Sequence, residues 1–248
     1  MRSLILTLTL LSFSDSLFAQ TVNTSTSLSG VIAAHGGAAA AAVGTIQILA
    51  HHTVRGATES VKISANVTDG EFRVDYGQPV TRSEVVPGVK SGVAPYELSN
   101  GNRRNKQGFV GLFAQLDMLS VLGIQPFTGV EAQVANVGSA TLNGRPVTRL
   151  QVVSGRKQTY YSRVLPDQAE IQIDAATGLV VGISRVLSAE QNLDHTFQRT
   201  YVFSDFRTVN GLVFPFQIER HADGALQDTL IVDTVQLNPV FTTDLFRN

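Results

Sequence analysis

Apolar and polar residues alternate along most of the chain with the period of two that is typical of a half-buried β-strand. The alternation is clearest from Ser60 to Thr68 and, after the turn pair Asp69-Gly70, from Glu71 to Tyr76. The pattern predicts ten or eleven strands joined mostly by tight turns. The other predicted strands and turn pairs are Thr45–Ala50, Pro79–Val86, Val93–Leu98, Val130–Leu142, Asn143-Gly144, Pro146–Val153, Leu179–Leu187, Phe197–Phe206, Asn210-Gly211, Leu212–Arg220, Asp223-Gly224 and Leu226–Leu237.

Two segments have helical spacing instead. Leu28–Ala42 is rich in alanine and is interrupted at Gly36-Gly37, and His35 is expected to cap the helix end there, favoured by the helix dipole. Phe109–Leu122 carries an apolar stripe at offsets of three and four. Between the strands, Asn100–Gly108 is expected to be a polar, basic loop. With no long linker, the simplest architecture is one mainly β (α+β), antiparallel domain.

The N-terminus has the order of a secretory signal peptide. Arg2 precedes an apolar stretch, and Ala19 offers a small residue at the cleavage site. We expect residues 1–19 to be the signal peptide, 20–27 a polar leader and 28–248 the folded domain. The chain has no cysteine for lipid attachment and no apolar run of the roughly 20 residues that span a bilayer. The expected location is the periplasm or the outside of the cell.

Composition and motifs narrow the chemistry. Lys+Arg number 19 and Asp+Glu 20, a balance that argues against a nucleic-acid partner. Without cysteine, disulfides, thiol catalysis and cysteine-zinc sites are excluded. His51 and His52 are neighbours on a predicted strand, so their side chains should leave opposite faces rather than share a metal. Ser154–Lys157 matches a Ser-x-x-Lys pattern but lies at a strand end instead of a helix start. We therefore expect no catalytic residue, metal or cofactor, and no enzyme.

What remains is the shape of the sheet. A long antiparallel sheet with one apolar face needs a cover, and two helical segments, one of them made of small residues, are little cover for ten strands. We expect an apolar hollow in which each CH₂ of a guest acyl chain would contribute about 0.8 kcal/mol. Its expected lining is Ile46, Ile48, Val61, Ile63, Phe72, Val74, Phe109, Leu112, Phe113 and Leu116.

The order of these motifs resembles the LolA/LolB-type lipoprotein carriers and their lipoprotein-sorting-like relatives. The resemblance rests on Ala33–Gly37 before the first strand, Asp69–Phe72, Ile173–Leu179, Phe203–Pro215 and the terminal Val235–Pro239 and Asp244–Phe246. It implies an unclosed, curved half-barrel with helices covering its concave face, binding lipoprotein acyl chains or other lipid in the periplasm. It also implies an arginine that pins the lid helix by bonding its backbone, with Arg55 and Arg73 as candidates.

Two other function classes stay open at this level. The same fold with a closed core would suit a sensor or scaffold that binds envelope membrane proteins. A hydrolase of envelope polymers would need an acid, histidine or serine cluster in a cleft.

Overall fold

The computed structural model describes residues 24–87, 95–105, 132–154, 168–189, 192–242 and 244–247. These form two helices, α1 (Thr24–Ala34) and α2 (Ala38–Ala41), and thirteen strands. The strands are β1 (Thr45–Val54), β2 (Ala57–Asn66), β3 (Glu71–Tyr76), β4 (Arg82–Val86), β5 (Tyr96–Ser99), β6 (Asn102–Asn105), β7 (Ala132–Leu142), β8 (Arg145–Ser154), β9 (Gln168–Asp174), β10 (Val180–Ala189), β11 (Asn192–Val209), β12 (Leu212–Ala222) and β13 (Ala225–Leu237).

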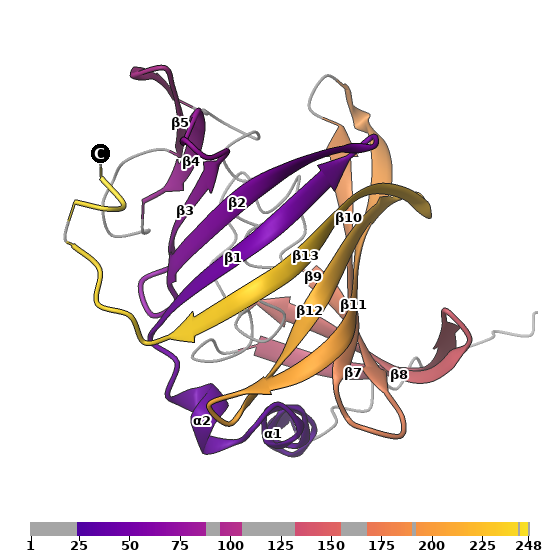
Figure 1. The fold of residues 1–248 in the computed structure, drawn as a ribbon. Coiled ribbons are helices and arrows are strands. Elements are labelled where there is room, and N and C mark those ends of the chain that lie inside the picture. The colour runs from indigo at the N-terminus through magenta and orange to yellow at the C-terminus, as the bar shows by residue number, and fades with distance from the viewer. Residues whose placement is uncertain are drawn as a thin grey trace, which may run out of the picture.

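All thirteen strands belong to one antiparallel sheet, which curls but does not close (Figure 1). Its order is β6-β5-β4-β3-β2-β1-β13-β12-β11-β10-β9-β8-β7, so β6 and β7 are its edges. Every neighbour in this order is adjacent in the chain except β1 and β13, which join the N-terminal and C-terminal halves. The predicted open, mainly β architecture is confirmed.

The expected strand count was too low, and the expected loop from Asn100 to Gly108 was wrong in its first half. Asn100 and Gly101 have positive φ angles of 50° and 77° and turn the chain into β6. The four residues of β6 are all exposed and polar, so their sequence carries no alternation that could predict a strand. These four residues form a strand only through their pairing with β5.

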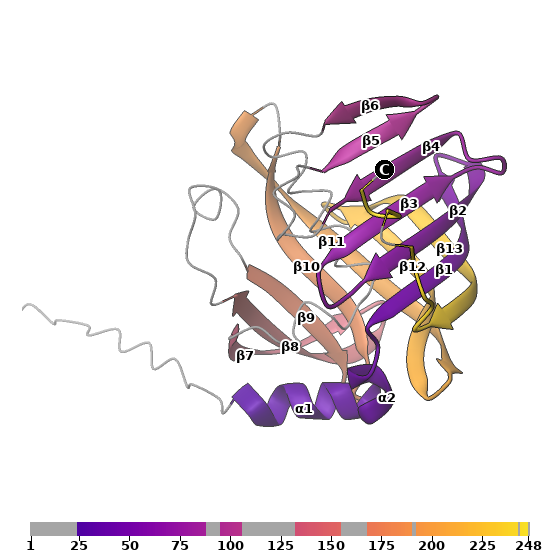
Figure 2. The ribbon, with the colours of Figure 1, turned by 90° about the vertical axis from the view of Figure 1, so that its left-hand side faces the viewer.

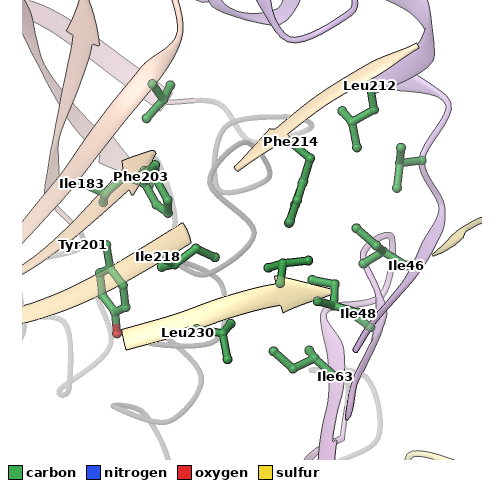
Figure 3. Packing of buried hydrophobic residues seen from close by; sticks show 14 of the residues in the cluster. Ile46, Ile48, Ile63, Ile183, Tyr201, Phe203, Leu212, Phe214, Ile218 and Leu230 are labelled. Atoms are coloured by element: carbon green, nitrogen blue, oxygen red, sulfur yellow. The ribbon is translucent and has the colours of Figure 1, made fainter. Parts of the chain in front are cut away.

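The core lies on the concave face of the sheet, where residues of alternate positions converge from both halves (Figure 3). Ile46 and Ile48 of β1 meet Ile218 of β12 and Leu230 of β13 in this cluster. Phe203 and Phe214, exposed by 2% and 1%, add the large rings. The polar residues at the intervening positions of the same strands face outward. The period of two in the sequence therefore explains why one face of the sheet is buried and the other is not.

The helices close one end of the hollow sheet. Figure 2 shows α1 running beneath β7, β8 and β9, with α2 at its end. Helix α1 begins at Thr24, four residues before the predicted start and inside the expected polar leader. The predicted signal peptide and the predicted helix Phe109–Leu122 lie outside the described residues. No helix in the described part of the chain is long and apolar enough to cross a membrane.

A C-terminal segment covers part of the convex face. Phe246 is only 4% exposed, and Val85 and Tyr96, whose side chains leave the opposite face from the concave core, are each 1% exposed. Arg73 donates a hydrogen bond from Nη1 to the backbone oxygen of Leu245 at 3.2 Å. Arg73 therefore does pin a backbone, as one candidate for the lid residue should, but it pins the C-terminal turn.

Candidate functional site

The end of the half-barrel away from the helices contains a pocket of about 490 Å³ on the concave face. Strand direction places it there: β1 and β12 both start beside the helices, and the pocket is lined by residues near their far ends. Apolar side chains form one part of its lining, namely Val54, Val61, Ile63, Val74, Ile218 and Leu230. This volume lies within the range of roughly 300–1,000 Å³ that is common for small-ligand sites.

Charged side chains form a continuous arc along the rest of the pocket wall. Arg220 of β12 and Asp228 of β13 form the tightest pair, with Nε donating to Oδ2 at 2.7 Å. Asp228 Oδ1 lies 3.5 Å from His52 Nε2, and His52 Nδ1 lies 3.8 Å from Glu59 Oε1. We call these four residues, together with Arg82 and Glu84, the charged arc.

The second half of the charged arc is built on β2 and β4, beside Tyr76 of β3. A guanidinium nitrogen of Arg82 lies 3.7 Å from Glu59, and the other lies 3.9 Å from Glu84. The Arg82 guanidinium also stacks on the ring of Tyr76, 3.9 Å from its centroid. This position supplies a cation–π contact at the pocket wall.

Burial and charge tune two groups in this wall. Burial alone would raise the pKa of Asp228, but hydrogen bonding from His52 and the charge and hydrogen bonds of Arg220 hold that pKa below its ordinary value. Asp228 is therefore a carboxylate. Burial raises the pKa of the Tyr76 phenol, and the neighbouring Glu84 raises it further, so Tyr76 stays a neutral hydroxyl.

The six described residues of the predicted apolar lining lie together on the concave face. Val61, Ile63 and Val74 line the pocket. Ile46, Ile48 and Phe72 are exposed by 2%, 0% and 0% and pack in the core nearer the helices. The other four predicted lining residues, Phe109, Leu112, Phe113 and Leu116, lie outside the described residues.

Sequence reasoning missed the charged arc. His52 and Glu59 share the parity of the apolar positions in β1 and β2, respectively, so alternation could have placed them on the concave face. That would have shown that the apolar face of β1 and of β2 becomes polar at one end of each strand. Arg220 and Asp228 likewise share the parity of the apolar positions in β12 and β13, but alternation could not show that they meet His52, because that depends on the pairing of β13 with β1 and β12.

His35 holds the closed end together. Its Nδ1–H donates to the oxygen of Val213 at 2.9 Å, and its Nε2 accepts from the N–H of Val180 at 3.0 Å. Val213 N–H in turn donates to the backbone oxygen of His35 at 3.0 Å. Burial lowers the pKa of His35, so the ring is neutral. The expected position at the helix end is confirmed, but the expected attraction of an imidazolium to the helix dipole was wrong.

The two adjacent histidines do point to opposite faces, as predicted. His51 pairs with Asp233 at 2.9 Å, whereas His52 faces the pocket. Within the described residues, no group of three or more histidine, aspartate or glutamate side chains is placed to hold a metal ion.

Comparison with known proteins shows which solved structures share this architecture. No protein-family model and no curated protein sequence matches the chain. A DUF1329-family protein from Desulfovibrio piger superposes with a TM-score of 0.60 at 10% identity, over 90% of this chain and 96% of that one. A domain described as an outer membrane lipoprotein-sorting protein domain, from Vibrio parahaemolyticus, gives 0.54 at 10% identity, over 82% and 89%.

A LolA superfamily protein from Nitrosomonas europaea gives a TM-score of 0.52 at 8% identity, over 82% of this chain and 89% of that chain. At such identities the likeness concerns the course of the backbone. The fold resemblance inferred from the order of the sequence motifs is therefore confirmed: this chain shares the fold of the lipoprotein-sorting domain and of the LolA superfamily protein.

Proposed function

We propose that this protein binds an apolar ligand, the acyl chains of a lipoprotein or another lipid, in the concave hollow of its half-barrel. The observation that carries the proposal is the pocket of about 490 Å³, whose apolar residues continue into the buried face of the sheet. A chain with about ten buried methylene groups would gain roughly 8 kcal/mol from their burial, before the cost of ordering the chain.

The proposed binding needs no chemical step. The charged arc consists of ion pairs and stacking contacts that join neighbouring strands, and the proposal assigns it no nucleophile or general acid. We also propose that the protein works in the periplasm after removal of residues 1–19 and carries its ligand between envelope membranes. The fold it shares with a lipoprotein-sorting domain and a LolA superfamily protein supports this proposal.

Filling the pocket tests the proposal. Val61 and Val74 both line it, so Val61→Phe and Val74→Phe would place a ring where the ligand should lie. We expect each variant to weaken binding of the neutral fluorophore Nile red by at least about tenfold, the equivalent of about 1.4 kcal/mol. A mass spectrum of the organic extract of the purified wild-type protein should show lipid that both variants lack.

Val186→Phe is the matched control, because it makes the same change on the outside of β10, where Val186 is 51% exposed. It should bind Nile red like the wild type. Circular dichroism and thermal melting would verify that each variant folds. If folded Val61→Phe and Val74→Phe proteins bind the dye and retain lipid as the wild type does, the pocket is not the binding site and the proposal fails.

A further inference from the structure

Two exposed side chains of opposite charge at the pocket wall make no hydrogen bond to any described residue. They are Glu59 and Arg82, which are 40% and 38% exposed. Nη2 of Arg82 lies 3.7 Å from Glu59 Oε1, and Nη1 lies 3.9 Å from Glu84 Oε1. Both distances exceed the roughly 2.7–3.2 Å of a hydrogen bond. Arg82 therefore keeps donors, and Glu59 keeps acceptors, that a ligand in the pocket can reach.

A hydroxyl group fits each of the two gaps between Arg82 and its carboxylate neighbours. The hydroxyl oxygen can accept a hydrogen bond from the guanidinium group, and the hydroxyl proton can be donated to the facing carboxylate. An oxygen about 2.8–2.9 Å from both atoms bridges a separation of 3.7 Å or 3.9 Å. Each of these hydrogen bonds has one ionised partner and is therefore of the stronger, charge-assisted kind.

The two gaps lie side by side. Nη1 and Nη2 are bonded to the same carbon, in the fork with which arginine holds two neighbouring oxygens. The oxygens of a vicinal diol, which sit on adjacent carbons, match this fork. One hydroxyl would lie between Nη2 and Glu59, and the other between Nη1 and Glu84. A carboxylate has several acceptor positions, so Glu84 can take this proton in addition to its other contacts.

An ionic head group fits this wall less well than a neutral one. An anion held by Arg82 would lie close to the carboxylates of both Glu59 and Glu84, and a cation held by Glu59 would lie equally close to Arg82. Either ion would also lose its hydration beside the apolar lining, which costs far more than the transfer of a hydroxyl group. Arg220 and Asp228, which also line the pocket, are paired with each other. The wall therefore favours an uncharged head group.

From this arrangement we infer that the pocket binds a lipid whose uncharged head group is a vicinal diol, the group carried by an acylglycerol or by a sugar ring. The diol lies in the fork of Arg82, between Glu59 and Glu84. The apolar chain extends over Val61 and Ile63, which follow Glu59 at every second position of β2 and line the same pocket. This inference rests on the proposed function, since it assigns a head group to the ligand of the same pocket.

Ligands with the same dodecyl chain test the inference by displacement of Nile red below their micelle concentrations. The main pair is dodecane-1,2-diol and its isomer with one hydroxyl at each end of the chain. The dimethyl ether of the vicinal diol keeps both oxygens but cannot donate, and dodecanoate and dodecylamine carry a negative and a positive charge. We expect the vicinal diol to bind at least about tenfold more tightly than each of the other four ligands.

A second comparison separates the two sources of a vicinal diol. Glycerol with one dodecanoyl chain on a terminal oxygen carries the diol at its free end, whereas dodecyl glucoside carries diols on a sugar ring. The one that displaces Nile red at the lower concentration identifies the source. If both bind more weakly than the isomer with separated hydroxyls, the inference fails.

Variants test the two exposed side chains separately. Arg82→Lys keeps the positive charge but loses the fork, so the affinity ratio of the vicinal diol to its isomer should fall several-fold. Glu59→Met removes an acceptor, so the ratio of the vicinal diol to its dimethyl ether should fall several-fold. The matched controls lie outside the pocket: Arg103→Lys, since Arg103 likewise stacks on a tyrosine, and Glu219→Met. Both controls should keep the wild-type ratios. Should Arg82→Lys fail to fold, Glu59→Met still tests the site.

Three further results would overturn the inference. If the vicinal diol and its isomer bind equally, or if either ion binds most tightly, the head-group assignment is wrong while the proposed apolar site stands. If both pocket variants fold and keep the wild-type ratios, Arg82 and Glu59 do not recognise the head group. If no ligand displaces the dye and no lipid is extracted, the proposed function fails and the inference fails with it.

Discussion

Replacing His35 tests whether one buried ring joins the helices to the sheet. In β12, pairing with β13 starts only at Gln217, so the N–H and oxygen of Val213 depend on His35 for their partners. His35→Leu keeps a side chain of similar size but leaves the oxygen of Val213 and the N–H of Val180 without their hydrogen-bond partners. Each buried group left unsatisfied costs about 1–3 kcal/mol, so we expect the free energy of unfolding to fall by about 2–6 kcal/mol.

Urea unfolding followed by circular dichroism measures this loss. For a slope of about 2–3 kcal/mol per molar, the midpoint should move down by roughly 0.7–3 M. Such a change is a large part of the roughly 5–15 kcal/mol that stabilises an ordinary domain. If the His35→Leu protein unfolds at the wild-type midpoint, His35 does not join the helices to the sheet, because the two hydrogen bonds at 2.9 Å and 3.0 Å would then contribute nothing to stability.

The same residue makes a pH prediction. Burial holds the pKa of folded His35 below 6.5, its value in an unfolded chain. The unfolded chain therefore takes up a proton at a higher pH than the folded protein does. The stability that the neutral ring contributes is fully present above pH 6.5 and is lost as the pH falls through the lower, folded-state pKa. The unfolding free energy of wild type minus that of His35→Leu should shrink over this range, and a constant difference would contradict the reasoning.

Two further predictions concern backbone space and buried carboxylates. Gly36 has a φ of +112°, and a Cβ there would lie 2.0 Å from the oxygen of Gly211, so Gly36→Ala should cost more than about 2 kcal/mol in urea unfolding. Gly30→Ala, with open space in α1, should instead stabilise by about 0.5–1 kcal/mol. Hydrogen bonds and arginine charges outweigh burial and lower the pKa values of Asp75 and Asp228 below 3.8, so their contribution is present above that pH and is lost as the pH falls. The double variant Asp75→Asn/Asp228→Asn should lose stability at pH 7 and unfold with a flatter pH dependence below pH 4 than the wild type.

These predictions carry their own controls. If Gly36→Ala and Gly30→Ala change stability equally, the close approach of the α1–α2 turn to the β11–β12 turn is not what requires glycine. If the double aspartate variant keeps the steep acid limb of the wild type, other carboxylates cause the acid unfolding.

Most of the strands could be predicted because their physical cause is local. Alternation of Val61, Ile63 and Ala65 with polar neighbours is a property of consecutive residues, and it identified the buried face of β2 correctly. The tight turns at Asp69-Gly70 and Asn210-Gly211 are local as well, since both glycines adopt positive φ angles. Where the local signal is absent, as in the wholly polar β6, prediction failed.

The functional geometry depends on contacts between distant parts of the chain. His35 bonds residues 145 and 178 positions away, which no periodicity could indicate. The predicted pocket residues were chosen by periodicity and apolarity, so the deeply packed Phe72 could not be distinguished from Val74, which lines the pocket.

The sequence by itself determined which residues face inward, where the chain turns, and that one antiparallel, mainly β domain would result, because a period of two and a glycine turn act within a few residues. The open, curved form of the sheet was implied only by the family resemblance. Only the tertiary structure decided which inward-facing residues meet. Pairing of β1 with β13 brings His52 to Asp228, and the β2–β4 hairpins bring Glu59 to Arg82. Burial strengthens the contacts of Asp228, whose side chain is 9% exposed, and strand order, which alternation does not encode, selects the partners of both pairs.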